Sequence, residues 1–497
     1  MTGLLNSIPT SDWKTVLVAC ILLVLLLAAI ELINKRLRWN RSYLRKFVHI
    51  IVGLLICITS LQIKNSFPIL LISGFFIIFN LWAIRTHHLK SIHINEQSYG
   101  TVYYPLSIFI LALVLWSWYK EIFLISILIM TVPDALAGII GMRFARKFFV
   151  IITEKKSLVG AITMFISSMP IVSISLYSLF NKSISFSLAA GIMISIAITA
   201  AELLSHRGSD NLSVPLMTAI LMFGFLQHET ILNPLSLGIV LAVTVSILSY
   251  KVNFLDLSGA GGAFLLGLII FGFGGWLFTI PIMIFYISSS ALSIIGKRRK
   301  KKFASLFEKT GRRDIYQVLA NGGIPGILVL LNYFNPAALI YYMYLAALAT
   351  ATADTWATEI GIFSRSRPWL ITNLNRVEPG RSGAISGLGS LAALCGSALI
   401  AFTGVMTSPQ ANYSEWLLIF TITFAGFAGN FIDSICGASF QAQFRCGQCG
   451  KHTERKIHCT IKTDHISGLL IMNNDFVNFF SISCGAFFLF GIYHYFF

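Results

Sequence analysis

The chain has 497 residues, of which 56% are hydrophobic and 11% are charged, and its 37 Lys and Arg against 20 Asp and Glu give a formal net charge of +17. Soluble domains carry about 25% charged residues, so this composition excludes an ordinary soluble protein and indicates a membrane-embedded, multi-pass protein. The surplus of basic residues has uses in membrane topology and in phosphate binding, and we expect no nucleic-acid partner.

Apolar runs long enough to cross a bilayer recur along the whole chain. We therefore expect an all-α polytopic membrane protein with about sixteen transmembrane helices. The first run is long and lacks a small-residue cleavage site, so a cleavable signal peptide is not expected. The expected spans lie near residues 14–34, 46–61, 67–84, 102–119, 121–141, 158–180, 184–204, 211–226, 231–250, 258–275, 278–296, 314–332, 336–357, 382–405, 415–437 and 476–497.

The basic residues gather in five of the connections between these spans, whereas the intervening connections are short and nearly uncharged. With sixteen spans the basic connections all fall on one side, which the positive-inside rule makes cytoplasmic. Topology alone explains these lysines and arginines, and phosphate binding in the same compartment is the other use that remains open. The basic connections are residues 35–46, 143–156, 297–313, 365–381 and 445–462.

Three apolar runs contain acidic residues beside glycine. Asp134 lies in "VPDALAGIIG", Asp354 and Glu359 lie in "ATADTWATEIG", and Asp433 lies in "GNFIDSICGA" with Asn430 just before it. A carboxylate inside a bilayer is costly and is a functional-site hypothesis by default. We therefore interpret these acids as parts of functional sites near the cytoplasmic ends of their helices.

The surroundings of these acids repeat in the same order in two parts of the chain. Gly100, Asp134, Ser157 and Asp210 follow one another at intervals of 34, 23 and 53 residues, and Gly322, Asp354, Ser382 and Asp433 at 32, 28 and 51. This pattern predicts two similar parallel halves, residues 1–250 and 251–497, that arose by duplication. Chance similarity among glycine-rich and serine-rich membrane helices is the alternative.

The polar residues of each half are suited to phosphoryl transfer. Carboxylate and amide oxygens bind Mg²⁺ together with substrate phosphates, and basic residues at a glycine-containing helix start hold the phosphates of a nucleotide. We assign catalytic roles to Asp134, Asp210, Asp354, Asp433 and Glu359. We assign nucleotide binding to Lys155, Lys156, Ser157, Gly160, Asn211, Arg381, Ser382, Gly383 and Asn430.

The acceptor would reach such a site from the membrane, and a lipid alcohol is the simplest choice. The common soluble scaffolds for this chemistry are absent, because the chain has no "GxxxxGK[ST]" loop and no "GxSxG" elbow. A transporter or flippase of a lipid phosphate remains the alternative, since intramembrane charges and internal repeats are also transporter traits.

Two further motifs are less specific. In "RKFVHIIVG", His49 lies four residues after Arg45 and shares its helix face, where it would bind phosphate or act as an acid–base group, or else be an interfacial histidine satisfied by a neighbour. In "CGQCGKHTERKIHC", the CxxC pair and the later His-Cys pair can close a tetrahedral structural zinc site, with spare thiols in a basic loop as the alternative. Its ligands would be Cys446, Cys449, His458 and Cys459.

The first half resembles the membrane family of dolichol kinase, phytol kinase and other polyprenol kinases, over residues 40–225. The resembling segments are "RKFVHIIVG", "YGTVYYPLSIF", "VPDALAGIIG", "EKKSLVGAITMF" and "AELLSHRGSDNLSVPL". The second half, residues 251–497, resembles the integral-membrane family that includes phytyl-phosphate kinase. The segments there are "LDLSGAGGAFLLG", "RRDIYQVLANGG", "ATADTWATEIG", "GRSGAISGLG", "FIDSICGASFQAQF" and "CGQCG…HC".

This resemblance implies a fusion of two kinases of isoprenoid biosynthesis that use CTP and a divalent cation. The first would convert an isoprenoid alcohol, such as phytol, geranylgeraniol or farnesol, into its monophosphate, and the second would convert that lipid phosphate into the diphosphate. The resemblance places nucleotide and metal handling on twelve of the residues assigned above. They are Asp134, Lys156, Ser157, Gly160, Asp210 and Asn211 in the first half, and Asp354, Glu359, Ser382, Gly383, Asn430 and Asp433 in the second. The chain departs from many relatives at Val159, where they have an acidic residue before the glycine. No oligomeric state is indicated.

Overall fold

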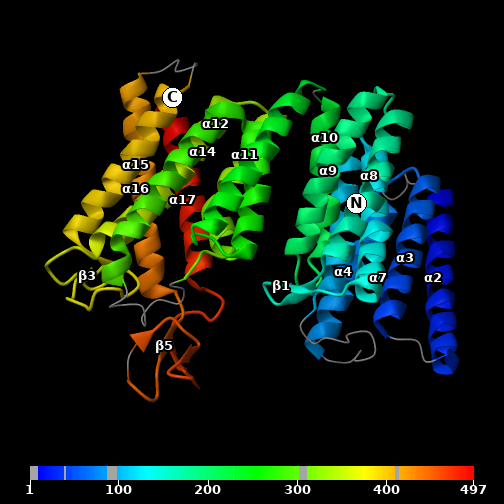
Figure 1. Ribbon diagram of the computed structural model, residues 1–497, viewed down its shortest axis with the longest axis horizontal. Coiled ribbons are helices and arrows are strands. Elements are labelled where there is room, and N and C mark those ends of the chain that lie inside the picture. Colours follow the sequence, from blue (N-terminus) through cyan, green and yellow to red (C-terminus); the bar gives the residue numbers. More distant parts are fainter. Residues whose placement is uncertain are drawn as a thin grey trace. The chain divides into compact units, whose positions relative to one another are not determined.

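The computed structural model describes residues 9–37, 41–86, 98–227, 229–300, 311–408, 414–450 and 452–496. Parts of three basic connections, residues 38–40, 301–310 and 451, lie outside the described residues. The chain forms two compact units, Met1–Leu232 and Asn233–Phe497, and each is described by itself (Figure 1). Its regular structure is mostly helix, which confirms the all-α membrane fold expected from the apolar runs.

Unit 1 is a bundle of helices with one short hairpin, which stands out from the side of the bundle near one end (Figure 1). Its helices are α2 (Thr10–Leu37), α3 (Arg41–Gln62), α4 (Phe67–Thr86), α5 (Gly100–Leu115), α6 (Lys120–Thr131), α7 (Pro133–Phe144), α8 (Leu158–Ser178), α9 (Ile184–Leu204), α10 (Asp210–Gln227) and the short η1 (Glu229–Ile231). Between α7 and α8 the antiparallel strands β1 (Phe149–Ile151) and β2 (Glu154–Lys156) form the hairpin.

Unit 2 has the same kind of helical bundle and two places with short strands. Its helices are α11 (Leu232–Lys251), α12 (Leu257–Lys300), α13 (Ile315–Phe334), α14 (Ala338–Gly361), α15 (Gly387–Met406), α16 (Glu415–Ser439) and α17 (Asn474–Phe496). Strands β3 (Trp369–Leu370) and β4 (Ala384–Ile385) pair between α14 and α15.

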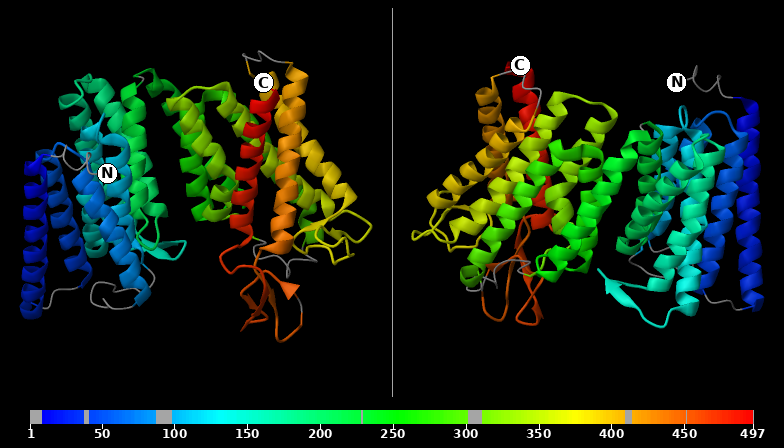
Figure 2. Two further views of the ribbon diagram at one scale, coloured as in Figure 1. Left: turned by 180° about the vertical axis from the view of Figure 1, so that it is seen from behind. Right: turned by 45° about the horizontal axis from the view of Figure 1, so that its top comes forward.

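The connection between α16 and α17 carries the remaining strands. They are β5 (Gln443–Arg445), β6 (His452–Thr453), β7 (Ile457–His458), β8 (Ile461–Lys462) and β9 (Asp464–Ser467). Strand β5 pairs with both β6 and β9, and β7 pairs with β8. Figure 2 shows this small sheet beyond the ends of α16 and α17, which lie side by side.

Each of the sixteen expected spans is helical over most of its length. Twelve helical segments among the described residues are long and apolar enough to cross a membrane, and Gly100–Leu115 is a shorter apolar helix. The expected span 121–141 is interrupted, because α6 ends at Thr131 and α7 begins at Pro133. Proline lacks an N–H and suits the first position of a helix, so it starts a new helix there.

The long segment α12 consists of two helices that run in opposite directions. Gly275 interrupts it with φ 60° and ψ −163°, a conformation that residues with a Cβ rarely adopt. Residues before Gly275 follow α13 along its length, and residues after it follow α14, which runs opposite to α13. The contacts are Gly262–Ile315 and Phe273–Tyr333 for the first part, and Phe278–Tyr344 and Ser293–Glu359 for the second.

The last four spans of each unit pack in the same pattern. In unit 1, α8 packs against α7 and α9, and α10 packs against α9 and α6. In unit 2, α15 packs against α14 and α16, and α17 packs against α16 and α14. The pair α6 and α7 therefore corresponds to α14, and the following helices correspond in order. This agreement supports the two similar parallel halves, although α11, which the sequence-based division placed in the first half, belongs to unit 2.

The closest match between the units is a capped helix start packed on a glycine. Ser157 accepts a hydrogen bond from the N–H of Gly160 at the start of α8, and Ser386 accepts one from Gly389 at the start of α15. A Cβ on Gly160 or Gly389 would lie 3.1 Å from a backbone carbonyl oxygen of the preceding long helix. Small residues at these positions therefore let the two helices approach closely.

This geometry corrects the pairing of Ser382 with Ser157. The counterpart of Ser157 is Ser386, because it is the residue that caps the next helix and has a glycine three positions later. Ser382 lies four residues earlier, in the connection before β4. The expected span 382–405 accordingly begins as a helix only at Gly387.

Substitution of Gly389 tests this close approach. Gly389→Ala places a Cβ 3.0 Å from the Ser386 Oγ and 3.1 Å from the Ala357 carbonyl oxygen, and we expect it to lower the free energy of unfolding by about 1–3 kcal/mol through overpacking. Gly387→Ala, in the same helix with nothing within 4 Å of the new Cβ, is the control and is expected to be neutral or stabilising. Thermal unfolding in detergent measures both, and equal effects would contradict the packing argument.

Candidate functional site

A cavity of about 1050 Å³, lined by many polar side chains, lies within unit 2, between the ends of its helices and the connections that join them. Helices α12 to α17 contribute to its lining, as do the connections that follow α11, α12, α14 and α16. The structure brings together here all seven residues of the second half that were assigned to catalysis or nucleotide binding. They are Asp354, Glu359, Arg381, Ser382, Gly383, Asn430 and Asp433.

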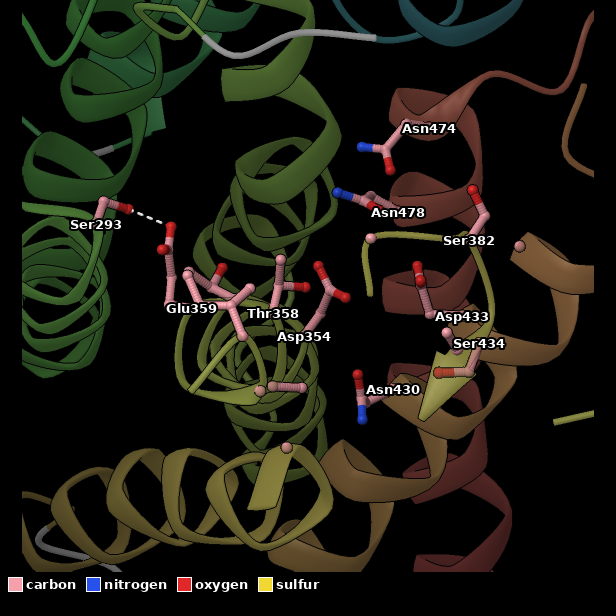
Figure 3. A pocket seen from close by; sticks show the side chains of 18 of the residues that line it. Ser293, Asp354, Thr358, Glu359, Ser382, Asn430, Asp433, Ser434, Asn474 and Asn478 are labelled. Atoms are coloured by element: carbon pink, nitrogen blue, oxygen red, sulfur yellow. Dashed lines mark hydrogen bonds between the residues drawn. The ribbon is translucent and has the colours of Figure 1, made fainter. Parts of the chain in front are cut away.

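The centre of the cavity is defined by two aspartates from different helices. Figure 3 shows Asp354 of α14 and Asp433 of α16 on opposite sides of one space, with Asn430 also facing it. Asn430 precedes Asp433 by three residues, so both lie on one face of α16. The Ser481 hydroxyl of α17 donates a hydrogen bond of 3.0 Å to Oδ2 of Asp433. Carboxylate and amide oxygens therefore converge from α14 and α16.

Glu359 lies at another side of the cavity. Its side chain is turned toward α12, where the Ser293 hydroxyl donates a hydrogen bond of 2.6 Å to Oε1 (Figure 3). Glu359 is only 4% exposed. The structure thus places Glu359 in the lining, but its carboxylate faces Ser293 and not the space between the two aspartates.

The segment Arg381, Ser382 and Gly383 enters the cavity from the connection before α15. Gly383 has φ +71°, and a Cβ there would lie 2.5 Å from the carbonyl oxygen of Ser434 in α16. Glycine is therefore required for this segment to lie against α16. Arg381 is exposed at the rim, whereas the Ser382 hydroxyl donates a hydrogen bond to the carboxylate of Glu454.

Several lining residues were not predicted from the sequence. Arg313 is one of them, held by backbone hydrogen bonds between its N–H and the Phe254 carbonyl and between its carbonyl and the Asp256 N–H. Burial lowers the pKa of its guanidinium, while the charges of Glu359 and Asp354 oppose that shift, and an arginine stays protonated in proteins. Its membership of the basic connection 297–313 was the available signal. Other unpredicted polar residues of the lining include Ser293, Gln317, Asn321, Glu454, Asn474, Asp475 and Asn478.

The helix order also corrects the pairing of Asp210 with Asp433. Asp210 begins α10, the last helix of its four-helix set, whereas Asp433 belongs to α16, the third helix of the corresponding set. The counterpart of Asp210 and Asn211 is the start of α17, where Asn474 and Asp475 lie. The connection before α17 is long and contains strands, so the residue spacing that leads to Asp210 in the first half reaches only the preceding helix, α16, in the second. The sequence did contain a signal for this correspondence, because an acid and an amide stand side by side at the start of both helices.

In unit 1, Asp134 forms a buried ion pair. The Lys46 ammonium lies 2.7 Å from Oδ2 of Asp134, and the Asp134 side chain is 4% exposed. His49, three residues after Lys46 on the same face of α3, has Nε2 at 3.9 Å from the same oxygen and at 3.0 Å from the Met130 carbonyl oxygen. The predicted His49 is thus beside Asp134, and Lys46 was missed although it ends the first basic run.

A second buried pair in unit 1 involves Lys156. Its ammonium lies 2.8 Å from Oε1 of Glu202 and 3.3 Å from the Ser205 hydroxyl. Burial opposes the charge on Lys156, but the carboxylates of Glu202 and Asp210 outweigh it and raise the pKa of Lys156. Lys155, its neighbour in β2, is exposed because successive residues of a strand point to opposite sides.

The other residues predicted for nucleotide binding in unit 1 make local structural contacts. Ser157 caps α8 and Gly160 permits the approach of α7, as described above. The Asn211 side-chain amide donates a hydrogen bond of 3.3 Å to the carbonyl oxygen of Gly100 and so joins the starts of α10 and α5. Their role in binding a nucleotide stays a prediction.

The four predicted metal ligands lie together in the connection between α16 and α17. The ligand atoms of Cys446, Cys449, His458 and Cys459 are all within 4.8 Å of one another. In a tetrahedral zinc site with Zn–S bonds of about 2.3 Å, neighbouring ligand atoms lie roughly 3.5–3.8 Å apart. The side chains present therefore fit a zinc ion.

Comparison with known proteins identifies the family. Residues 240–486 match the family described as integral membrane protein DUF92. Protein PGR of Arabidopsis thaliana is 30% identical to this chain over 271 residues, which are 50% of this chain and cover 93% of that protein. The chain belongs to the DUF92 family. The residues that line the cavity, from Val252 to Asn478, all lie within the region of the DUF92 match.

Two other relatives extend the comparison. The phytol kinase of Synechocystis is 34% identical over 129 residues, which are 26% of this chain and 55% of that protein. The chloroplastic protein VTE6 of Arabidopsis thaliana is 26% identical over 243 residues, 47% of this chain and 63% of that protein. No solved structure matches the chain.

The buried ion pair of this DUF92 protein can be tested by removing one charge. We expect Lys46→Met to lower the free energy of unfolding by about 3–5 kcal/mol, because Asp134 is left charged and buried. Adding Asp134→Asn to this variant should restore part of the loss. Thermal unfolding in detergent measures the effect.

An exposed pair of the same length serves as the control. Lys182 and Glu229 lie 2.8 Å apart, but the Glu229 side chain is 64% exposed. Lys182→Met should therefore lower the free energy of unfolding by less than about 1 kcal/mol. If Lys46→Met is as mild as Lys182→Met, burial does not govern the Asp134 pair.

Proposed function

We propose that the protein phosphorylates an isoprenoid alcohol in two steps, with CTP as the phosphoryl donor and Mg²⁺ as the metal. Residues 1–250 form the monophosphate and residues 251–497 form the diphosphate. The printed name of one relative, phytol kinase, supports a prenol kinase. The observation that carries the proposal is the cavity of unit 2, in which acidic, amide and basic groups converge from four helices, α13, α14, α16 and α17, and from the connections between helices.

The acidic side of the cavity fits a divalent cation. Asp354, Asp433 and Asn430 offer oxygen ligands from two helices to one space (Figure 3), and Mg²⁺ is bound in proteins by one or two carboxylates together with substrate phosphates. When bound, the ion would neutralise charge on the phosphates of the nucleotide. The protein residues would fix its position.

The remaining polar groups suit the phosphates themselves. Arg313 is held in the lining by two backbone hydrogen bonds, and a guanidinium binds phosphate oxygens in a bidentate manner. The Ser382 hydroxyl and the backbone at Gly383 lie at the same cavity. In the second step the acceptor is a phosphate oxygen that is already anionic, so positioning and charge neutralisation supply most of what the reaction needs.

The first step requires removal of a proton, because its acceptor is a hydroxyl group. In unit 1 we assign this role to Asp134, with His49 beside it. The Lys46 ammonium, 2.7 Å from Oδ2, holds the carboxylate in place. Lys156, paired with Glu202, is the cation that we assign to the nucleotide.

Membrane topology supports the access of a cytoplasmic nucleotide. The basic connections that contain Arg313 and Arg381 both line the cavity of unit 2, and connections rich in lysine and arginine stay on the cytoplasmic side of a membrane. We therefore propose that the sites face the cytoplasm. The lipid substrate would enter from the bilayer between the helices.

Asparagine substitutions in the cavity test the second step. With labelled CTP, Mg²⁺ and a prenol series in detergent, Asp354→Asn and Asp433→Asn should lower formation of the diphosphate by about 10²–10³-fold, so that the prenyl monophosphate accumulates. Glu415→Gln is the matched control, because Glu415 begins the helix that carries Asp433 and lies roughly 27 Å from it along the axis. Equal diphosphate formation in all variants would refute the site.

The first step is tested separately. Asp134→Asn should form neither product from a prenol, whereas supplied prenyl monophosphate should still yield the diphosphate at the wild-type rate. Glu229→Gln, which removes an exposed acid of unit 1, should behave like the wild type. If no variant and no wild-type preparation turns over a nucleotide, but a lipid phosphate crosses vesicle membranes, the protein is a transporter and the proposal fails.

A further inference from the structure

The connection between α16 and α17 carries a compact group of metal-ligating side chains outside the helices. Nδ1 of His458 lies 3.1 Å from the Cys459 sulfur and 3.6 Å from the Cys449 sulfur. The Cys446 sulfur belongs to the same group, in which every ligand atom is within 4.8 Å of the others. Cys446 is fully buried, whereas Cys449 and Cys459 are exposed. The group thus forms one closed set at the surface of the sheet.

The donor set is that of a structural zinc ion. Three thiolates and one imidazole complete a tetrahedral shell, and they leave no open position for catalysis. Soft sulfur ligands with one imidazole favour zinc over magnesium, calcium or manganese, which prefer oxygen. No disulfide joins cysteines within the described residues. A disulfide between two of these three cysteines would leave the third thiol unpaired.

The backbone around the ligands is folded to bring them together. After Cys449, Gly450 has φ +70° and its N–H donates a hydrogen bond of 2.8 Å to the Cys446 carbonyl oxygen, so the two cysteines lie on one compact turn. Cys459 and Thr460 form the two-residue turn between β7 and β8 with φ 49° and 65°. Such turns are usually made by Asn-Gly, and conformations of this kind persist where the surroundings impose them. A metal bound at Cys459 would supply that constraint.

The same segment reaches the cavity through Glu454. This residue lies between the two ligand pairs in the sequence, lines the cavity, and accepts the hydrogen bond from Ser382. Its neighbours are fixed from both sides, since Thr453 pairs with Phe444 across β6 and β5, and the Thr463 hydroxyl donates 2.7 Å to the Arg455 carbonyl. The position of Glu454 therefore depends on the fold of the metal-ligating segment.

We propose that Cys446, Cys449, His458 and Cys459 bind one structural Zn²⁺, which orders this segment and so holds Glu454 against Ser382 at the cavity. The role assigned to Glu454 rests on the proposed function, whereas zinc binding does not. The zinc has no part in the chemistry of transfer. Glu454 acts as a positioning residue for the Ser382 segment.

Metal analysis of the full-length chain in detergent tests the site. We expect about one zinc per chain, lost in Cys449→Ser and in Cys459→Ser. Both thiols are exposed, so these variants disturb the packing less than a change at the buried Cys446. Cys395→Ser, at an exposed cysteine of α15, is the control and should keep its zinc. A wild-type chain that takes up no added zinc, a disulfide within the group, or unchanged zinc in both variants would overturn the proposal.

Proteolysis tests the positioning of Glu454 without relying on activity. Trypsin cuts after arginine and lysine, and Arg455 and Lys456 directly follow Glu454. Removal of zinc by a chelator should speed cleavage there, and Cys459→Ser should be cleaved quickly with or without the chelator. Glu454→Ala, which removes the acceptor of the Ser382 hydroxyl, should retain zinc yet slow diphosphate formation by about 10–100-fold. A cleavage rate that does not change when zinc is removed would overturn the ordering role, and normal diphosphate formation in Glu454→Ala would overturn only the positioning role.

Discussion

A carboxylate is tolerated in an apolar helix only where a counter-charge or a hydrogen-bond donor meets it, and both units are arranged around that requirement. Asp134 meets Lys46 from 88 residues away, and Glu359 meets Ser293 from 66 residues away. Each partner comes from another helix, so a carboxylate finds its partner only when the helices pack correctly. These contacts lie near the polar ends of the bundles.

The sequence alone predicted the helices and the acids but not their partners. Apolar runs locate spans directly, and an acid inside such a run is conspicuous by its cost. The partner of Asp134 or Glu359 depends on how helices that are distant in sequence rotate and pack against each other. No local sequence pattern predicts this packing. The pairing of Ser382 with Ser157 was wrong for a related reason, because the connection after α14 is longer than the one after α7 and intervals shift with connection length.

The two units share the same helix packing, but their charged residues stand at different positions. Each has a serine-capped helix packed through glycine on the preceding long helix. In unit 1 the residue before the cap is Lys156, whereas in unit 2 it is Ile385, and a cation reaches the site of unit 2 from Arg313 instead. The two units share this backbone packing, since a small residue is needed where these helices touch, whereas their charged residues come from different elements.

Gly275 has a consequence for the direction in which the later helices cross. An unbroken α12 of 44 residues would be roughly 66 Å long, about twice the hydrocarbon thickness of a bilayer. The reversal at Gly275 turns this length into two crossings, so the chain leaves α12 on the membrane face where it entered. A single passage would invert α13 to α17 and present Asp354 and Asp433 to the opposite compartment. The turn at Gly275 thus determines which side of the membrane the ends of helices α13 to α17 face.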